Sequence, residues 1–316
     1  VEPAMRASDV AGSIPSHAAR ARNDMDTIRR LAADAAAFAE AWERMPLVST
    51  GLDDFSDVFS VAIAERLIHS GMPLTAIRLY RDGTRLPVEG VAAERQGGLA
   101  EARADGASLL AHIGSGATVV LEYLQVYCPE VARFAADFAG DVGHSTYCAA
   151  FITPAGSRGI VPHYDTSSVF LRQIFGSKRW RVSAPVERWP TQEWRSTMSV
   201  DTERLVEVML EKDDCLYIPR GFIHAGDAVE EGSIHLTVAI TPTTWADTLR
   251  RAVTAAAASE ELREAVPARF LQADEAMLFR QKLAGLQMPV WRSPPPGAAA
   301  TTRDDLIGAL HRASQS

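Results

Sequence analysis

Two residues near the middle of the chain, His163 and Asp165, have the types and spacing of metal ligands. The stretch around them favours a β-strand, in which residues two apart point to the same face. A second histidine, His224, follows a Pro-Arg-Gly turn further along the chain. Two imidazoles and one carboxylate leave three positions open on an octahedral ion, as in non-heme Fe(II) oxygenases. We therefore predict that His163, Asp165 and His224 are the metal ligands and the catalytic centre.

Three segments around these residues resemble the JmjC/cupin-like family that includes the ribosomal oxygenases. They read Gly-Ile-Val-Pro-His-Tyr-Asp (159–165), Gly-Ser-Lys-Arg-Trp-Arg-Val (176–182) and Tyr-Ile-Pro-Arg-Gly-Phe-Ile-His (217–224). The resemblance covers roughly residues 38–242. It implies a double-stranded β-helix (jelly-roll or cupin) core that binds Fe(II) and uses 2-oxoglutarate and O₂ as cosubstrates.

The resemblance also implies a site for the distal carboxylate of 2-oxoglutarate. Lys178 matches the family's basic residue, and we expect Lys178, Trp180 and Val182 to share one face of the strand that returns after a Gly-Ser turn. Only three of the 32 basic residues are lysines, which favours a specific role for this one. Thr237 matches the family position whose hydroxyl supplements the carboxylate contact, although a plain strand residue fits equally well.

Two further positions bear on the expected pocket. His235 lies two residues before Thr237 and is therefore expected to line the same face, but it lacks the turn that precedes His224 and is the weaker candidate for a metal ligand. The family often has an asparagine where this chain has Ala149. The candidates to replace that contact are Tyr147, Arg172 and Gln173.

The elements that position these residues change character along the chain. We predict a flexible N-terminus (1–25), a JmjC/cupin-like catalytic domain with N-terminal helices (26–242), a helical region (243–288), and a Pro-rich tail with a weak helix (289–316). Helical spacing of apolar residues runs from Asp26 until Pro46, and again within 51–70, 129–138, 245–264 and 268–286. Strands are expected over 75–80, 118–121, 148–153, 161–174, 179–183, 215–218 and 234–240.

Composition excludes several classes of partner. The formal net charge of −8 argues against nucleic-acid binding, which depends on clustered basic residues. No apolar stretch reaches the roughly 18 residues of a membrane helix, and no signal peptide is recognisable. The three cysteines are widely separated, which indicates reduced thiols in a cytoplasmic protein and argues against a cysteine-rich zinc site.

The leading hypothesis is a hydroxylase that acts on a side chain of a protein or peptide and yields succinate and CO₂. We expect stable hydroxylation and not demethylation. The alternative is a tailoring oxygenase for a small natural product or a carrier-bound amino acid, and a non-catalytic cupin binding protein is less favoured. The apolar residues within 245–286 exceed what one jelly roll needs for packing, and they predict a homodimer.

Overall fold

The computed structural model describes residues 26–93, 102–157, 159–195, 203–257 and 260–263, together with residues 265 and 277. One antiparallel sheet of eleven strands dominates the fold, and its main path runs β1-β10-β7-β11-β5-β4-β2-β3. The remaining strands attach as β6 to β11 and β8, and β9 to β7. The strands are β1 (Leu47–Ser49), β2 (Ile77–Arg81), β3 (Thr84–Leu86), β4 (Thr118–Leu121), β5 (Ser145–Thr153), β6 (His163–Tyr164), β7 (Ser168–Ser183), β8 (Trp194–Arg195), β9 (Arg204–Leu210), β10 (Cys215–Ile218) and β11 (Ile223–Thr241).

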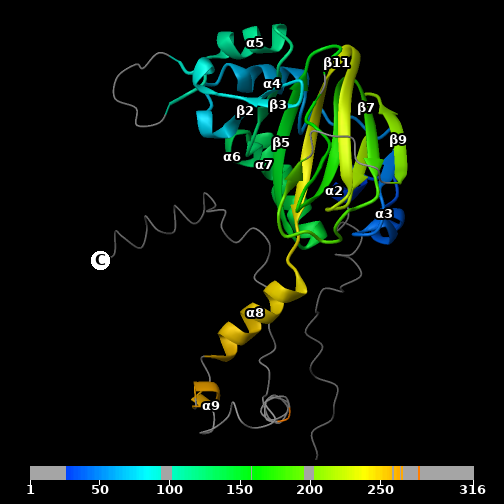
Figure 1. The fold of residues 1–316 in the computed structure, drawn as a ribbon, viewed down its shortest axis with the longest axis vertical. Coiled ribbons are helices and arrows are strands. Elements are labelled where there is room, and N and C mark those ends of the chain that lie inside the picture. Colours follow the sequence, from blue (N-terminus) through cyan, green and yellow to red (C-terminus); the bar gives the residue numbers. More distant parts are fainter. Residues whose placement is uncertain are drawn as a thin grey trace, which may run out of the picture.

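Two long strands, β7 and β11, pair along most of their length and form the centre of the sheet (Figure 1). The sequence prediction of separate strands, 161–174 then 179–183, was wrong, because β7 continues through residues 176–177 without reversing. Gly176 (φ +60°) pairs with Ser233, next to Gly232 (φ +78°), where the register shifts, so the ladder bends there. A Cβ at Gly176 would collide with the carbonyl oxygen of Gly232. Likewise, the strand expected over 234–240 is only the end of β11.

Several helices gather on one side of the sheet (Figure 1). The helical elements are α2 (Asp26–Arg29), α3 (Ala35–Ala41), α4 (Val61–Ile68), η1 (Leu74–Ala76), η2 (Glu89–Val91), α5 (Gly106–Gly114), α6 (Leu124–Tyr127), α7 (Pro129–Val142), α8 (Trp245–Ala256) and α9 (Glu260–Arg263). The longest, α7, starts with a proline and ends at Gly143 in the left-handed conformation, both of which favour these termini. It buries Val131, Phe134 and Phe138 in the main core, which also includes residues from α3 and α4.

The N-terminal helices are shorter than the sequence pattern predicts. The single helical run expected from Asp26 is two helices, because the Asp34 carboxylate caps a new start by accepting from the Ala36 backbone N–H at 2.8 Å. The pattern within 51–70 forms a helix only from Val61, where the Ser60 hydroxyl accepts from the Ile63 N–H. Phe55, from the first part of that pattern, is buried outside any helix.

At the C-terminal end of the described chain, α8 extends away from the sheet (Figure 1). The segment expected over 245–264 is divided into α8 and α9. The expectations for 1–25, 289–316 and, apart from Met277, 268–286 fall outside the described residues. None of the helices in the described ranges is long and apolar enough to span a bilayer.

Candidate active site

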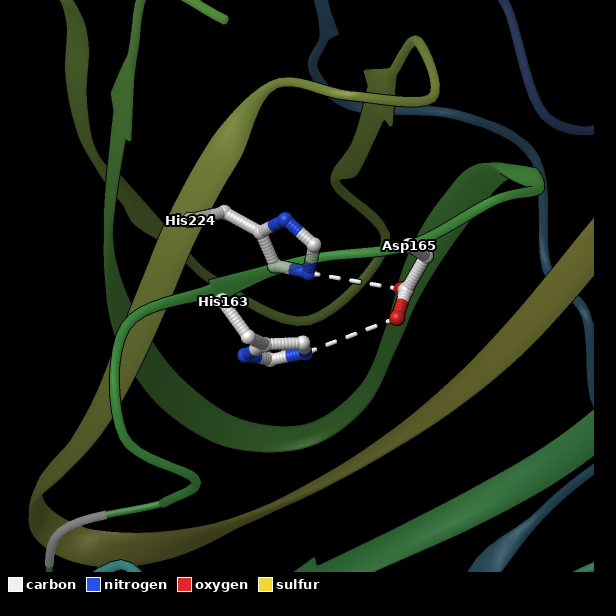
Figure 2. A group of neighbouring side chains, drawn as sticks. All are labelled: His163, Asp165 and His224. Atoms are coloured by element: carbon white, nitrogen blue, oxygen red, sulfur yellow. Dashed lines mark ion pairs between the residues drawn. The ribbon is translucent and has the colours of Figure 1, made fainter. Parts of the chain in front are cut away.

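The structure brings the three predicted metal ligands together. The strand β6 is shorter than expected: it contains His163 and Tyr164, and Asp165 is the first residue after it. His163 pairs directly with His224 of β11 across the antiparallel ladder. Figure 2 shows both imidazoles turned towards the Asp165 carboxylate. The Nε2 atoms of His163 and His224 lie 3.8 Å and 3.6 Å from its oxygens. One metal ion fits between them, since ligands about 2.1 Å from an ion are up to about 4.2 Å apart.

Backbone carbonyls fix the orientation and the tautomer of both histidines. The Nδ1 atom of His163 lies 2.9 Å from the carbonyl oxygen of Val161, and that of His224 lies 3.0 Å from the carbonyl oxygen of Phe222. A carbonyl oxygen only accepts, so each Nδ1 carries the proton and donates. The lone pair of a neutral ring is then on Nε2, the atom that faces Asp165. Each imidazole is therefore prepared to bind a cation at that atom.

A partly buried ion pair holds the turn that leads into β11 beside this cluster. The Arg220 guanidinium contacts both oxygens of Glu43, with the shortest distance, from Nη2 to Oε2, at 2.8 Å. The Ser168 hydroxyl donates to Glu43 and accepts from the Arg220 backbone N–H. The next N–H, of Gly221, donates to the carbonyl oxygen of Asp165 at 3.0 Å. The turn therefore fixes the backbone of Asp165 just before the chain enters β11.

Lys178 lies in the cavity that also contains the three-residue cluster, and its side chain is 2% exposed. The three residues expected to share one strand face, Lys178, Trp180 and Val182, are all buried. The ammonium donates to the Thr153 hydroxyl at 3.3 Å and lies 5.1 Å from the centre of the Trp180 ring. Burial lowers the pKa of Lys178 to about 7, while the Asp227 carboxylate partly offsets this. Lys178 has no buried counterion within the described ranges, and a confined lysine of this kind is suited to receive an anion.

The predicted partners of Lys178 line the same cavity. Thr237 and His235 lie on β11 and are both buried, and the His235 ring lies 5.4 Å from the Trp180 ring of β7. The Thr237 hydroxyl, the Trp180 indole N–H and the His235 Nδ1 have no hydrogen-bond partner among the described residues. Unpartnered polar atoms are costly to bury. Together with Lys178, they indicate a polar ligand that is an acceptor.

The structure reduces the three candidates for the contact that the family asparagine would make at Ala149. The Arg172 guanidinium donates to the backbone carbonyls of Asp53 and Asp213, and Gln173 donates to the carbonyl oxygen of Phe175 and the Ser233 hydroxyl. Neither residue lines the cavity. Tyr147 does, which leaves it as the remaining candidate of the three.

The cavity has a volume of about 170 Å³ and reaches residues that the sequence motifs do not identify. Arg78 and Tyr80 come from β2, Glu122 directly follows β4, and Glu193 directly precedes β8. Arg78 and Glu122 form an ion pair. No local pattern marks these residues, since their place in the site depends on how β2 and β4 extend the sheet.

Comparison with known proteins agrees with this site. Residues 129–248 match the JmjC domain family model. Ribosomal oxygenase 1 of Gallus gallus is 31% identical over 227 residues, which are 68% of this chain and 36% of that protein. The bifunctional lysine-specific demethylase and histidyl-hydroxylase NO66 of Brugia malayi is 31% identical over 172 residues, 50% of this chain and 24% of that protein. This chain thus spans about a third or less of these relatives' length.

The fold is shared with a solved structure. The crystal structure of Escherichia coli ribosomal oxygenase YcfD aligns with a TM-score of 0.52 and 20% identity, over 88% of this chain and 78% of that one. This likeness confirms the expected antiparallel β core with flanking helices. The JmjC match includes all three clustered residues and Lys178. Residues 129–248 therefore belong to the JmjC domain family, and the chain is similar to the ribosomal oxygenases.

Proposed function

We propose that this protein is an Fe(II)- and 2-oxoglutarate-dependent hydroxylase that acts on a side chain of a protein or peptide. One observation carries the proposal: two Nε2 atoms and a carboxylate converge in the same small cavity as a buried lysine that has no buried counterion among the described residues. The first group suits a divalent metal, and the second suits the distal carboxylate of a 2-oxo acid.

In this proposal, His163, Asp165 and His224 hold the metal, and their second contacts keep the donor atoms in place. Lys178 and Thr237 hold 2-oxoglutarate, and burial of the lysine keeps water from competing for the carboxylate. When bound, these groups and O₂ supply one chemistry: 2-oxoglutarate is converted to succinate and CO₂, and one oxygen atom enters a C–H bond. The protein's contribution is to place one C–H bond beside the metal and exclude the others.

The size of the cavity favours one side chain of a larger substrate. Its volume of about 170 Å³ is below the roughly 300–1,000 Å³ of sites that enclose a drug-sized molecule. A single side chain that enters from the surface needs less room. The two curated relatives have names that record ribosomal oxygenase, histidyl-hydroxylase and lysine-specific demethylase activities, all directed at proteins. This supports a protein substrate over a free natural product.

We further propose that the product is a stable hydroxylated residue. Both outcomes begin with C–H oxidation, and only the oxidation of an N-methyl group releases formaldehyde. All three cysteines are free and buried, and none belongs to a group of possible metal ligands among the described residues, which argues against the zinc site of an accessory reader module.

Incubation of the purified protein with Fe(II), 2-oxoglutarate and fractionated lysate under air tests this proposal. We expect succinate and a protein that gains one oxygen atom by mass spectrometry, neither of which forms with His224→Ala. A modified small molecule in place of a protein would support the tailoring alternative. No succinate from the metal-loaded wild-type chain would favour a non-catalytic cupin and refute the proposal.

A homodimer through the C-terminal helices is also proposed. Trp245, Leu249 and Val253 recur every four residues along α8 and are 85%, 62% and 68% exposed. Such a stripe is costly to leave in water, and a two-fold contact between copies would cover it.

Burial raises the pKa of both Cys148 and Cys215 to about 12, so these thiols stay protonated, which suits a cytoplasmic protein.

A further inference from the structure

One ion pair at the cavity has no role in the metal or 2-oxoglutarate sites. Arg78 lies in β2, and Glu122 directly follows β4, the strand that pairs with β2. The Arg78 Nε donates to Glu122 Oε1 at 2.5 Å. The side chain of Glu122 is 9% exposed, and its second oxygen, Oε2, has no hydrogen-bond partner among the described residues. Both residues line the cavity.

A purely structural pair explains only half of this arrangement. Arg78 and Glu122 are diagonal neighbours on paired strands, and an ion pair there stabilises the sheet through Oε1 alone. The second oxygen would then be buried without compensation, which is unfavourable for a carboxylate. A ligand that donates a hydrogen bond would remove this cost.

The charges around the cavity indicate what that ligand is. The Lys178 ammonium faces the 2-oxoglutarate end, and the Asp165 carboxylate belongs to the metal ligands. Glu122 is therefore an acceptor left for the substrate. Glu122 and Tyr147 line the same cavity as the metal ligands His163, Asp165 and His224, so Glu122 borders the space next to the metal site.

We propose that Glu122, held by Arg78, determines specificity by accepting a hydrogen bond from an N–H donor on the substrate side chain. The donor belongs to an amide, imidazole, guanidinium or ammonium group. This inference rests on the proposed function and adds the chemical class that the site selects. Substrates with carboxylate or purely aliphatic side chains leave the acceptor unsatisfied and are rejected.

The substitution Glu122→Gln reverses the hydrogen bonding at this position. Arg78 only donates, so it binds the oxygen of the new amide, and the NH₂ group then takes the place of Oε2. The site becomes a donor with almost no change in shape. A structural role predicts a loss of stability without a change in substrate preference, whereas a selective role predicts that the preference inverts.

The probes are nonapeptide libraries with one fixed central residue and degenerate flanks. Binding is measured by calorimetry without O₂, on full-length protein loaded with Mn(II) and 2-oxoglutarate. We expect the wild-type chain to prefer central Asn, His, Arg or Lys over Leu and Glu. Glu122→Gln should lose about tenfold or more in affinity for the N–H donors and gain for central Glu. The matched control is Glu207→Gln, an exposed carboxylate paired with Arg204 on β9.

Each outcome distinguishes this inference from the proposed function. Failure of the wild-type chain to bind Mn(II) and 2-oxoglutarate would contradict the proposed function itself. Intact cosubstrate binding, together with no wild-type preference for N–H donors or an unchanged ranking in Glu122→Gln, would overturn the inference alone. Thermal midpoints of the two Gln variants show whether any loss reflects unfolding.

Discussion

Replacement of Lys178 by alanine should weaken 2-oxoglutarate binding by about tenfold or more. Its ammonium is buried, donates to the Thr153 hydroxyl, and makes no ion pair within the described part of the chain. A charge-assisted hydrogen bond contributes about 1.5–3 kcal/mol. At about 1.4 kcal/mol per decade, the loss is roughly tenfold to more than a hundredfold.

The pH dependence provides a second and independent signature of the same residue. Burial holds the pKa of Lys178 at about 7 in the protein without ligand, while the charge of Asp227 acts in the opposite direction. His235, which also faces it, stays neutral because burial lowers its pKa. Only protonated Lys178 attracts the carboxylate, so affinity is highest below pH 7. It should fall as pH rises through 7, approaching about tenfold per pH unit at higher pH.

The assay is calorimetric titration of the Mn(II)-loaded protein with 2-oxoglutarate between pH 6 and pH 9. The matched control is Lys212→Ala, because Lys212 is 62% exposed and contacts Asp213 at the surface. The control should follow the wild-type profile, and Lys178→Ala should bind weakly with little dependence on pH. Equal affinity of Lys178→Ala and the wild-type chain would refute the assignment. A wild-type profile that is flat through pH 7 would refute the titration argument.

Three further outcomes are expected. Arg220→Met leaves the partly buried Glu43 carboxylate without its charged partner, so it should lower the free energy of unfolding by about 1–3 kcal/mol and raise the Mn(II) dissociation constant. Chemical denaturation and metal titration would measure the two effects, and an unchanged metal affinity would show that the turn does not position the metal ligands. Light scattering at micromolar concentration should give a dimer of the 34.2 kDa chain, and the double variant Trp245→Ser, Leu249→Ser should be monomeric. A monomeric wild-type chain would contradict the proposed contact between the α8 helices of two copies. Finally, a modified substrate should retain one oxygen atom without formaldehyde, and stoichiometric formaldehyde would show demethylation.

The metal cluster could be predicted from the sequence because its determinants are local. The two-residue spacing of His163 and Asp165 and the Pro-Arg-Gly turn before His224 are short patterns with a direct geometric meaning. Because side chains alternate between the two faces of a strand, the sequence also predicted that Lys178 lies on the same face of β7 as Trp180 and Val182. Even so, the prediction of a turn at Gly176 was wrong. A glycine with positive φ can bend a strand or reverse it, and only the pairing with β11 decides which.

The substrate side of the cavity could not be predicted. Arg78 and Glu122 are far apart in sequence from the motifs, and their contact depends on the long-range pairing of β2, β4 and β5. The short strands β1, β3 and β8, and the longer β9, were also missed. β1, β3 and β8 have only two or three residues each, too few for a periodic signal. Most of β9 is not fully buried, so its apolar residues do not stand out.

The central claim is that one metal ion and 2-oxoglutarate bind together at His163, Asp165 and His224. The most direct test is an anaerobic titration of the protein with Fe(II) in the presence of 2-oxoglutarate, followed by visible charge-transfer absorption. We expect a band that saturates at one Fe(II) per chain and is lost in His163→Ala, whose folded state is checked by circular dichroism. A band of equal intensity in that variant, or none in the wild-type chain, would contradict the assignment of this metal site.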